Sequence, residues 1–189
     1  MIEIKNLSFS FGSHKIFENL CLKIEDGERV ILSGASGVGK TTLLRLILGL
    51  EKAKSGTLDT ENAKISTVFQ EDRLLPFKTV IENLTLFSDE QTALECLSAL
   101  RIGEAKDLYP SELSGGMARR VAIARALSVA ADIYILDEAF TGLDEENKMI
   151  AAEFINKKTA GKILIAVSHD SSDAELLGAK VLDINSLIC

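Results

Sequence analysis

The chain has 189 residues, of which 47% are hydrophobic, so it is long enough to bury one good core but too short for two ordinary independent domains. Its 21 basic and 28 acidic side chains give a net charge of −7, which removes any general electrostatic reason to bind DNA, RNA or an anionic membrane. No apolar run approaches the roughly 18 to 20 residues of a spanning helix, and no signal peptide precedes the first strand pattern, so a cytosolic protein is expected.

Apolar periodicity along the chain predicts alternating strands and helices. Strands are expected over 2–11, 20–27, 29–34, 64–70, 132–138, 162–169 and 180–184, and helices over 41–50, 90–103, 115–130 and 145–158, with a short helix before the last strand. This order predicts an α/β fold with a mostly parallel core sheet, antiparallel strands at the start, and a short helical insert between Gln70 and Ser114.

The three cysteines are not expected to form a site. Cys21, Cys96 and Cys189 lie far apart in the sequence and match neither a zinc nor a redox spacing. They are predicted to be core or terminal thiols.

The segment "GASGVGKT" fits the phosphate-loop pattern G-x-x-x-x-G-K-[ST] and lies between a buried strand and a helix. Its glycines let the backbone wrap a phosphate, Lys40 reaches the β and γ phosphates, and the Thr41 hydroxyl suits Mg²⁺. The predicted nucleotide-binding residues here are Gly34, Ala35, Ser36, Gly37, Val38, Gly39, Lys40, Thr41 and Thr42.

A buried strand, "DIYILDE", delivers two acidic residues at its carboxyl end, where ligands bind in open α/β sheets. Asp137 is placed to hold Mg²⁺, and Glu138 to polarise a water for attack on the γ-phosphate. Taken alone, the segment could also be an ordinary strand followed by an acidic helix start.

A second anion-binding pattern, "LSGG", stands before an arginine-bearing helix. The Ser114 hydroxyl and the N–H groups of Gly115 and Gly116 would supply hydrogen-bond donors to a phosphate at the helix start. The alternative is a helix start capped by serine.

Three further motifs follow the same order along the chain: Gln70 in "TVFQEDRLLPF", Asp144 in "TGLD" and His169 in "VSHD". With all of these motifs, nearly the whole chain resembles the ATP-binding subunit of an ABC transporter. The resemblance implies a P-loop ATPase that binds ATP and Mg²⁺ and works as a head-to-tail dimer, most simply of two identical chains. In that dimer "LSGG" of one chain closes over the γ-phosphate held by the other.

The resemblance also implies roles for single residues. Phe11 would stack on adenine, although it could instead be a core strand residue. Gln70 would contact Mg²⁺ or the attacking water, and His169 would reach the γ-phosphate and steady that water together with Glu138. Asp144 would cross the dimer interface. Ala139 departs from the proline that many relatives have after the acidic pair.

The expected organisation is one ABC ATPase domain over residues 1–189. A RecA-like core with its antiparallel β subdomain would take about 1–70 and 115–189, and a helical subdomain about 71–114.

The stretch "QEDRLLPF" is similar to that of importer ATPases of the nitrate, sulfonate and taurine type. Leu74, Leu75 and Phe77 would suit docking on a membrane permease, or they would simply pack the helical insert. The importer interpretation implies permease subunits, a substrate-binding protein, and a place on the inner face of the cell membrane.

Two other classes stay open at this point. A soluble ABC-type regulator would use the same dimer without a permease, although such proteins tend to carry paired cassettes, a long coiled coil or a basic tail. A P-loop GTPase or small-molecule kinase would explain the phosphate loop but not "LSGG", and "NKMI" at Asn147 lacks the aspartate that reads guanine.

Overall fold

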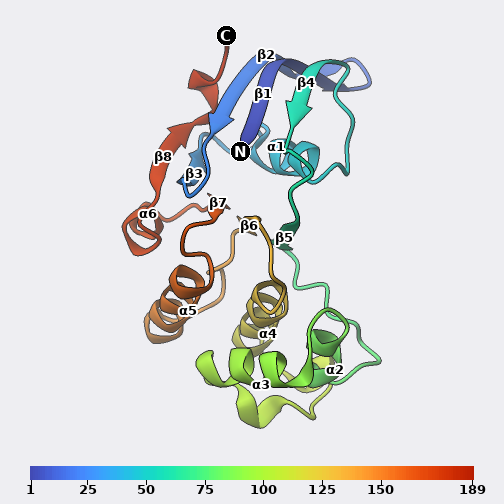
Figure 1. Cartoon of the computed structure of the whole chain (residues 1–189), viewed down its shortest axis with the longest axis vertical. Coiled ribbons are helices and arrows are strands. Elements are labelled where there is room, and N and C mark those ends of the chain that lie inside the picture. The colour runs from blue at the N-terminus through green and yellow to red at the C-terminus, as the bar shows by residue number, and fades with distance from the viewer.

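The computed structural model describes all 189 residues, which form two sheets and six α-helices. Figure 1 shows the antiparallel sheet and α1 at one end of the molecule, α2, α3 and α4 at the other end, and the parallel strands between them. None of the helices is long and apolar enough to cross a membrane.

The central sheet has five strands, and every neighbouring pair is parallel. Its spatial order is β5 (Ile65–Val68), β6 (Ile133–Asp137), β7 (Ile163–Val167), β3 (Arg29–Ser33) and β8 (Lys180–Asp183). Every residue of β6 and β7 is buried, as expected for strands that are covered on both faces. The predicted α/β fold with a parallel core is confirmed, and the carboxyl ends of β3, β6 and β7 meet at one edge.

The second sheet is antiparallel and has the order β2 (His14–Ile24), β1 (Ile2–Phe11) and β4 (Ser55–Asp59). β2 begins earlier than predicted, because pairing with β1 across the turn at Gly12 extends the hairpin into a polar stretch. β4 was not predicted, since it is short and largely exposed. Gly56 within it has a φ of 82°, and a Cβ there would lie 2.4 Å from the Asn6 carbonyl oxygen.

The helices are α1 (Lys40–Ile47), α2 (Val80–Thr85), α3 (Glu90–Ala99), α4 (Gly115–Leu127), α5 (Glu145–Lys158) and α6 (Ser172–Leu176). Short 3-10 turns follow at Gly103–Ala105, Pro110–Glu112 and Ile184–Ser186. α2 and α3 pack on each other and on α4. The subdomain boundaries near residues 71 and 114 stay a prediction.

Two hydrophobic cores lie on opposite faces of the parallel sheet. One core lies between the antiparallel sheet, α1 and one face of the parallel sheet, and includes Ile4, Leu43 and Ile165. The other core lies between the opposite face of the parallel sheet and α4, α5 and the helical insert, and includes Leu97 and Ile123. Since the consecutive residues Leu164 and Ile165 of β7 point to opposite faces and belong to different cores, the sheet is packed on both sides.

The prediction of three unpaired thiols is wrong for two of them. Cys21 of β2 and Cys189 form a disulfide, with their Cα atoms 5.5 Å apart. The segment before Cys189 pairs with β2, where the Cys21 N–H donates to the Leu187 carbonyl at 2.7 Å. This pairing joins residues 168 positions apart, so no sequence spacing could have indicated it. Cys96 is free and buried, as predicted.

We expect reduction of this disulfide to lower the free energy of unfolding by about 2–4 kcal/mol, because the crosslink restricts the unfolded chain. Denaturant unfolding with and without a phosphine reductant measures the difference. A Cys189→Ser variant is the control, since its stability should not respond to reductant. Equal stability of the native chain in both conditions would contradict the prediction.

Candidate functional site

The phosphate loop runs from the end of β3 into α1. Gly34, Gly37 and Gly39 have φ values of 143°, 80° and 111°, which favour glycine. A Cβ on Gly39 would lie 2.7 Å from the Phe17 ring, so the loop also needs glycine for its approach to β2. The buried Lys40 ammonium donates to the carbonyls of Gly34 and Ala35, at 2.7 and 3.0 Å. The loop is thus curled around its own lysine.

Beside the loop is a cavity of about 300 Å³ that brings together most of the predicted catalytic and phosphate-binding residues. It is lined by Ser36, Gly37, Gly39, Lys40, Thr41, Thr42, Gln70, Glu138, Val167 and His169. These residues come from the loop, from α1, from the last residue of β7, and from the segments after β5, β6 and β7. All four residues predicted to be catalytic therefore face one space.

Glu138 and His169 are neighbours in this cavity. The Oε1 atom of Glu138 lies 3.1 Å from Nε2 of His169, and the Glu138 side chain is 18% exposed. Glu138 has a φ of 52°, in the left-handed region that non-glycine residues seldom occupy. Its N–H still donates to the Val167 carbonyl, at 2.9 Å, so the backbone turns after β6 while staying attached to β7. This turn directs the carboxylate at the cavity.

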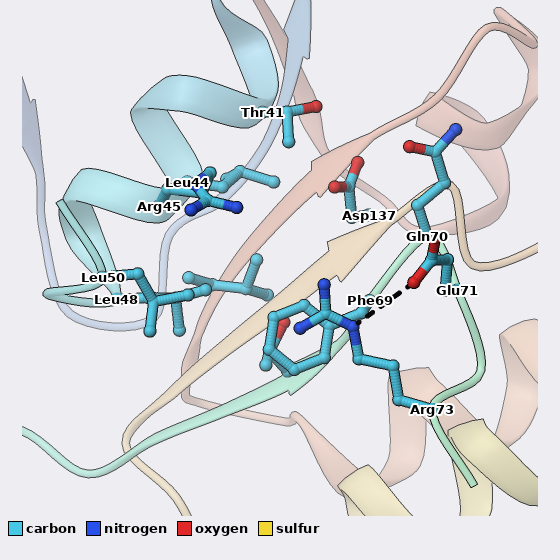
Figure 2. A pocket seen from close by; sticks show the side chains of 12 residues that line it. Thr41, Leu44, Arg45, Leu48, Leu50, Phe69, Gln70, Glu71, Arg73 and Asp137 are labelled. Carbon is cyan, nitrogen blue, oxygen red and sulfur yellow. Dashed lines mark ion pairs between the residues drawn. The ribbon is translucent and has the colours of Figure 1, made fainter.

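The predicted metal residues meet in an adjoining pocket of about 220 Å³, which Thr41, Gln70 and Asp137 help to line. Figure 2 shows Asp137 and Gln70 on one side of this pocket, with Thr41 nearby on α1. Asp137 is buried and its Oδ1 atom has no hydrogen-bond partner. Burial, and then the charge of Glu138, raises the pKa of Asp137. An unpartnered buried carboxylate oxygen beside a hydroxyl and an amide suits Mg²⁺, which takes oxygen ligands.

The "LSGG" segment does not line this cavity in the same chain. Ser114 is the N-cap of α4, and its hydroxyl accepts from the Met117 N–H at 3.2 Å. Gly115 and Gly116 form the first turn, and a Cβ on Gly116 would lie 3.4 Å from the Gly142 carbonyl oxygen. The capping alternative is therefore observed, while a role toward a partner's nucleotide stays a prediction.

Asp144 and Phe11 do not line the cavity either, and of the loop Gly34, Ala35 and Val38 lie outside it. Asp144 is the N-cap of α5 and accepts from the Asn147 N–H at 2.8 Å, a bond that lowers the pKa of Asp144. Phe11 ends β1, is 49% exposed and meets Phe9 edge to face at 4.8 Å. Its exposure removes the alternative of a core strand residue, and stacking on adenine stays a prediction.

Sequence reasoning missed a buried charge cluster next to His169. Lys148 of α5 forms ion pairs with Asp170 and with Asp173, the latter at 2.6 Å, and Ser168 donates to Asp173. Lys148 and Asp173 are both buried. The cluster therefore fixes the residues on both sides of His169 to α5. From the sequence alone, Lys148 is expected on the polar surface of its helix. Nothing in its pattern indicates this role.

A family model described as ABC transporter matches residues 17–141, which is most of the chain. The chain belongs to the ABC transporter family.

Individual ABC proteins agree with this assignment. The aliphatic sulfonates import ATP-binding protein SsuB 2 of Paracoccus denitrificans is 36% identical over 96% of this chain and 76% of its own length. The arginine transport ATP-binding protein ArtM of Bacillus subtilis is 34% identical over 96% of this chain and 86% of its own length. Among solved structures, the dimeric ATP-binding cassette MJ0796 with ADP and Pi has a TM-score of 0.83 and 30% identity, covering 93% of this chain and 91% of that one.

The chain is thus an ABC ATPase, which binds and hydrolyses ATP to power transport. The regulator, GTPase and kinase alternatives are set aside. The predicted family, fold, enzyme class and transport function are confirmed.

Proposed function

We propose that the chain is the ATPase subunit of an importer and that it hydrolyses Mg·ATP at the cavity between the phosphate loop and Glu138. The observation that carries this proposal is the convergence of Lys40, Glu138 and His169 on one cavity. The import function of the sulfonate relative, together with the likeness of "QEDRLLPF" to importer ATPases, supports the direction of transport.

Each residue would act on a different part of the reaction. Lys40 would leave its two loop carbonyls and bind the β and γ phosphates. Glu138 would accept the proton of the attacking water, and His169, at 3.1 Å from it, would hold that water and the γ-phosphate in line. Thr41, Gln70 and Asp137 would hold Mg²⁺, which neutralises the charge of the phosphates when bound.

The second chain would complete the site, since "LSGG" of the same chain does not line the cavity. Ser114, Gly115 and Gly116 of the partner would supply these donors at the start of their helix. Phe11 would stack on the adenine, and Asp144 would meet the partner across the interface. Dimerisation and ATP binding are then the same event.

The permease would dock on the segment that follows Gln70. Phe77 is 92% exposed and Leu75 is 44% exposed, which supports docking through these two side chains, whereas Leu74 packs against the core of the insert. The pocket in Figure 2 opens beside this segment, with Leu48 and Leu50 opposite Phe69 and the Arg73–Glu71 ion pair. An amphipathic helix of the permease would fit such a mixed surface.

This proposal places the subunit at the inner face of the cell membrane, held there by its permease. The imported solute would be delivered by a substrate-binding protein, because cargo recognition belongs to the other subunits.

The proposal is tested by a pull-down from detergent-solubilised membranes with tagged Glu138→Gln protein and Mg·ATP, followed by mass spectrometry. We expect a multi-spanning membrane protein to copurify, and the same protein with ADP to recover less of it. Recovery of only soluble proteins or nucleic acid, with the ATP dimer formed, would reject the importer role.

A further inference from the structure

Arg119 of α4 is one of the few charged side chains that the fold buries, with 3% of its surface exposed. Its guanidinium donates to five backbone carbonyls and to one carboxylate. The acceptors are the carbonyls of Phe69, Gln70, Asp137, Glu138 and Ala139, and Oδ1 of Asp72. All three nitrogen atoms of the guanidinium thus donate hydrogen bonds. These are side-chain bonds, so they add to the backbone bonds of the helices and strands.

These acceptors belong to two separate segments of the site. Nη1 bonds to the Phe69 carbonyl at 2.7 Å and to Asp72 at 3.0 Å, on the segment that carries Gln70. Nη2 bonds to the carbonyls of Asp137 and Glu138, at 2.9 and 2.7 Å. Because a guanidinium is planar and rigid, the two segments are held at a fixed separation through one group.

The segment around Glu138 needs such support. Glu138 has a φ of 52°, which is costly for a residue with a side chain and persists only where the surroundings enforce it. The N–H of Glu138 is held by β7, and its carbonyl is held by Arg119 and by the Thr141 N–H at 3.1 Å. Loss of the Arg119 bond would free one side of this strained peptide.

We propose that Arg119 is a positioning residue that links the Gln70 segment to the backbone of Glu138, so that displacement of the Gln70 segment moves the Glu138 carboxylate. The inference rests on the proposed function only in assigning the proton-accepting role to Glu138. It identifies a direct mechanical connection between the proposed permease-docking segment and the group that activates water.

The neighbouring arginines of α4 provide a matched comparison. Arg125 donates to the carbonyls of Asp72 and Arg73, both at 2.8 Å, and so holds only the Gln70 side. Arg120 donates to the Leu100 carbonyl at 2.9 Å and so holds the helical insert. Of these three side chains, Arg119 alone contacts the backbone next to Glu138.

The test compares Arg119→Lys with Arg125→Lys in single-turnover ATP hydrolysis by the full chain, with Mg·ATP affinity measured separately. A lysine keeps the charge but lacks the planar fork, so it cannot span both segments. We expect Arg119→Lys to lower the hydrolysis rate about tenfold to a hundredfold, as displaced catalytic groups do, with ATP affinity within about twofold of the native chain. Arg125→Lys should keep the rate within about twofold.

A double variant separates positioning from a general structural role. If Arg119 acts through the Glu138 carboxylate, Arg119→Lys should have little further effect in the Glu138→Gln background. An equal loss in both backgrounds, an unchanged rate in folded Arg119→Lys, or an equal loss in Arg125→Lys would each overturn the proposal. Should Glu138→Gln itself keep full turnover, the proposed role of Glu138 fails, which is a different result.

If Arg119→Lys does not fold, Asp72→Ala provides a milder probe, because Asp72 is partly exposed and the substitution removes the one carboxylate that Arg119 contacts on the Gln70 segment. Hydrogen exchange should then become faster at residues 137–141 as well as at 69–73. Faster exchange confined to 69–73 would show that no link exists.

Discussion

Glutamine in place of Glu138 is expected to lower the rate of ATP hydrolysis by about a hundredfold to ten-thousandfold, because the amide cannot accept a proton from the attacking water. The change keeps the size of the side chain and its approach to His169, 3.1 Å from Glu138 in the native chain. ATP binding should therefore survive, and a dimer should accumulate with Mg·ATP. Single-turnover hydrolysis and size-exclusion chromatography with ATP measure the two effects.

The matched control is Glu153→Gln, which removes an exposed carboxylate from α5, outside the cavity. It should hydrolyse ATP at the native rate. Native turnover in Glu138→Gln would remove Glu138 from the reaction and leave the cavity as a binding site only.

Alanine in place of Lys40 is expected to weaken ATP binding itself, on the order of a hundredfold or more, because charge-assisted contacts to the β and γ phosphates are lost. In the structure Lys40 is already aimed into the loop, where it donates to the carbonyls of Gly34 and Ala35. Titration calorimetry with ATP, in the presence of Mg²⁺, measures the change. Hydrolysis at saturating ATP should fall as well, since the ammonium also stabilises charge on the γ-phosphate.

Lys52→Ala is the control for this variant, because Lys52 is exposed and follows α1 outside the phosphate loop. Its ATP affinity should match that of the native chain. If Lys40→Ala binds ATP as tightly as Lys52→Ala, nucleotide binding does not depend on this loop as proposed. Together with Glu138→Gln, the pair separates the binding of ATP from its hydrolysis.

The sequence alone predicted what depends on local order along the chain. Strand, loop and helix periodicity located the phosphate loop between β3 and α1, and Asp137 and Glu138 at the end of β6. These residues predicted a phosphate-binding site, because a phosphate loop binds phosphate through the backbone N–H groups of one continuous segment. Even so, β4 was missed, since a short exposed edge strand has no apolar pattern to detect.

The tertiary structure decided which distant residues meet. His169 reaches Glu138 because β6 and β7 are neighbours in the sheet, an order that periodicity does not give. The Cys21–Cys189 disulfide and the Arg119 bonds to two separate segments arise in the same way. The residue type of an arginine or a cysteine does not show whether the side chain is exposed or buried. Only packing between elements determines its partners. The sequence therefore determined the chemistry of this ATPase, and the fold determined how its parts are held against one another.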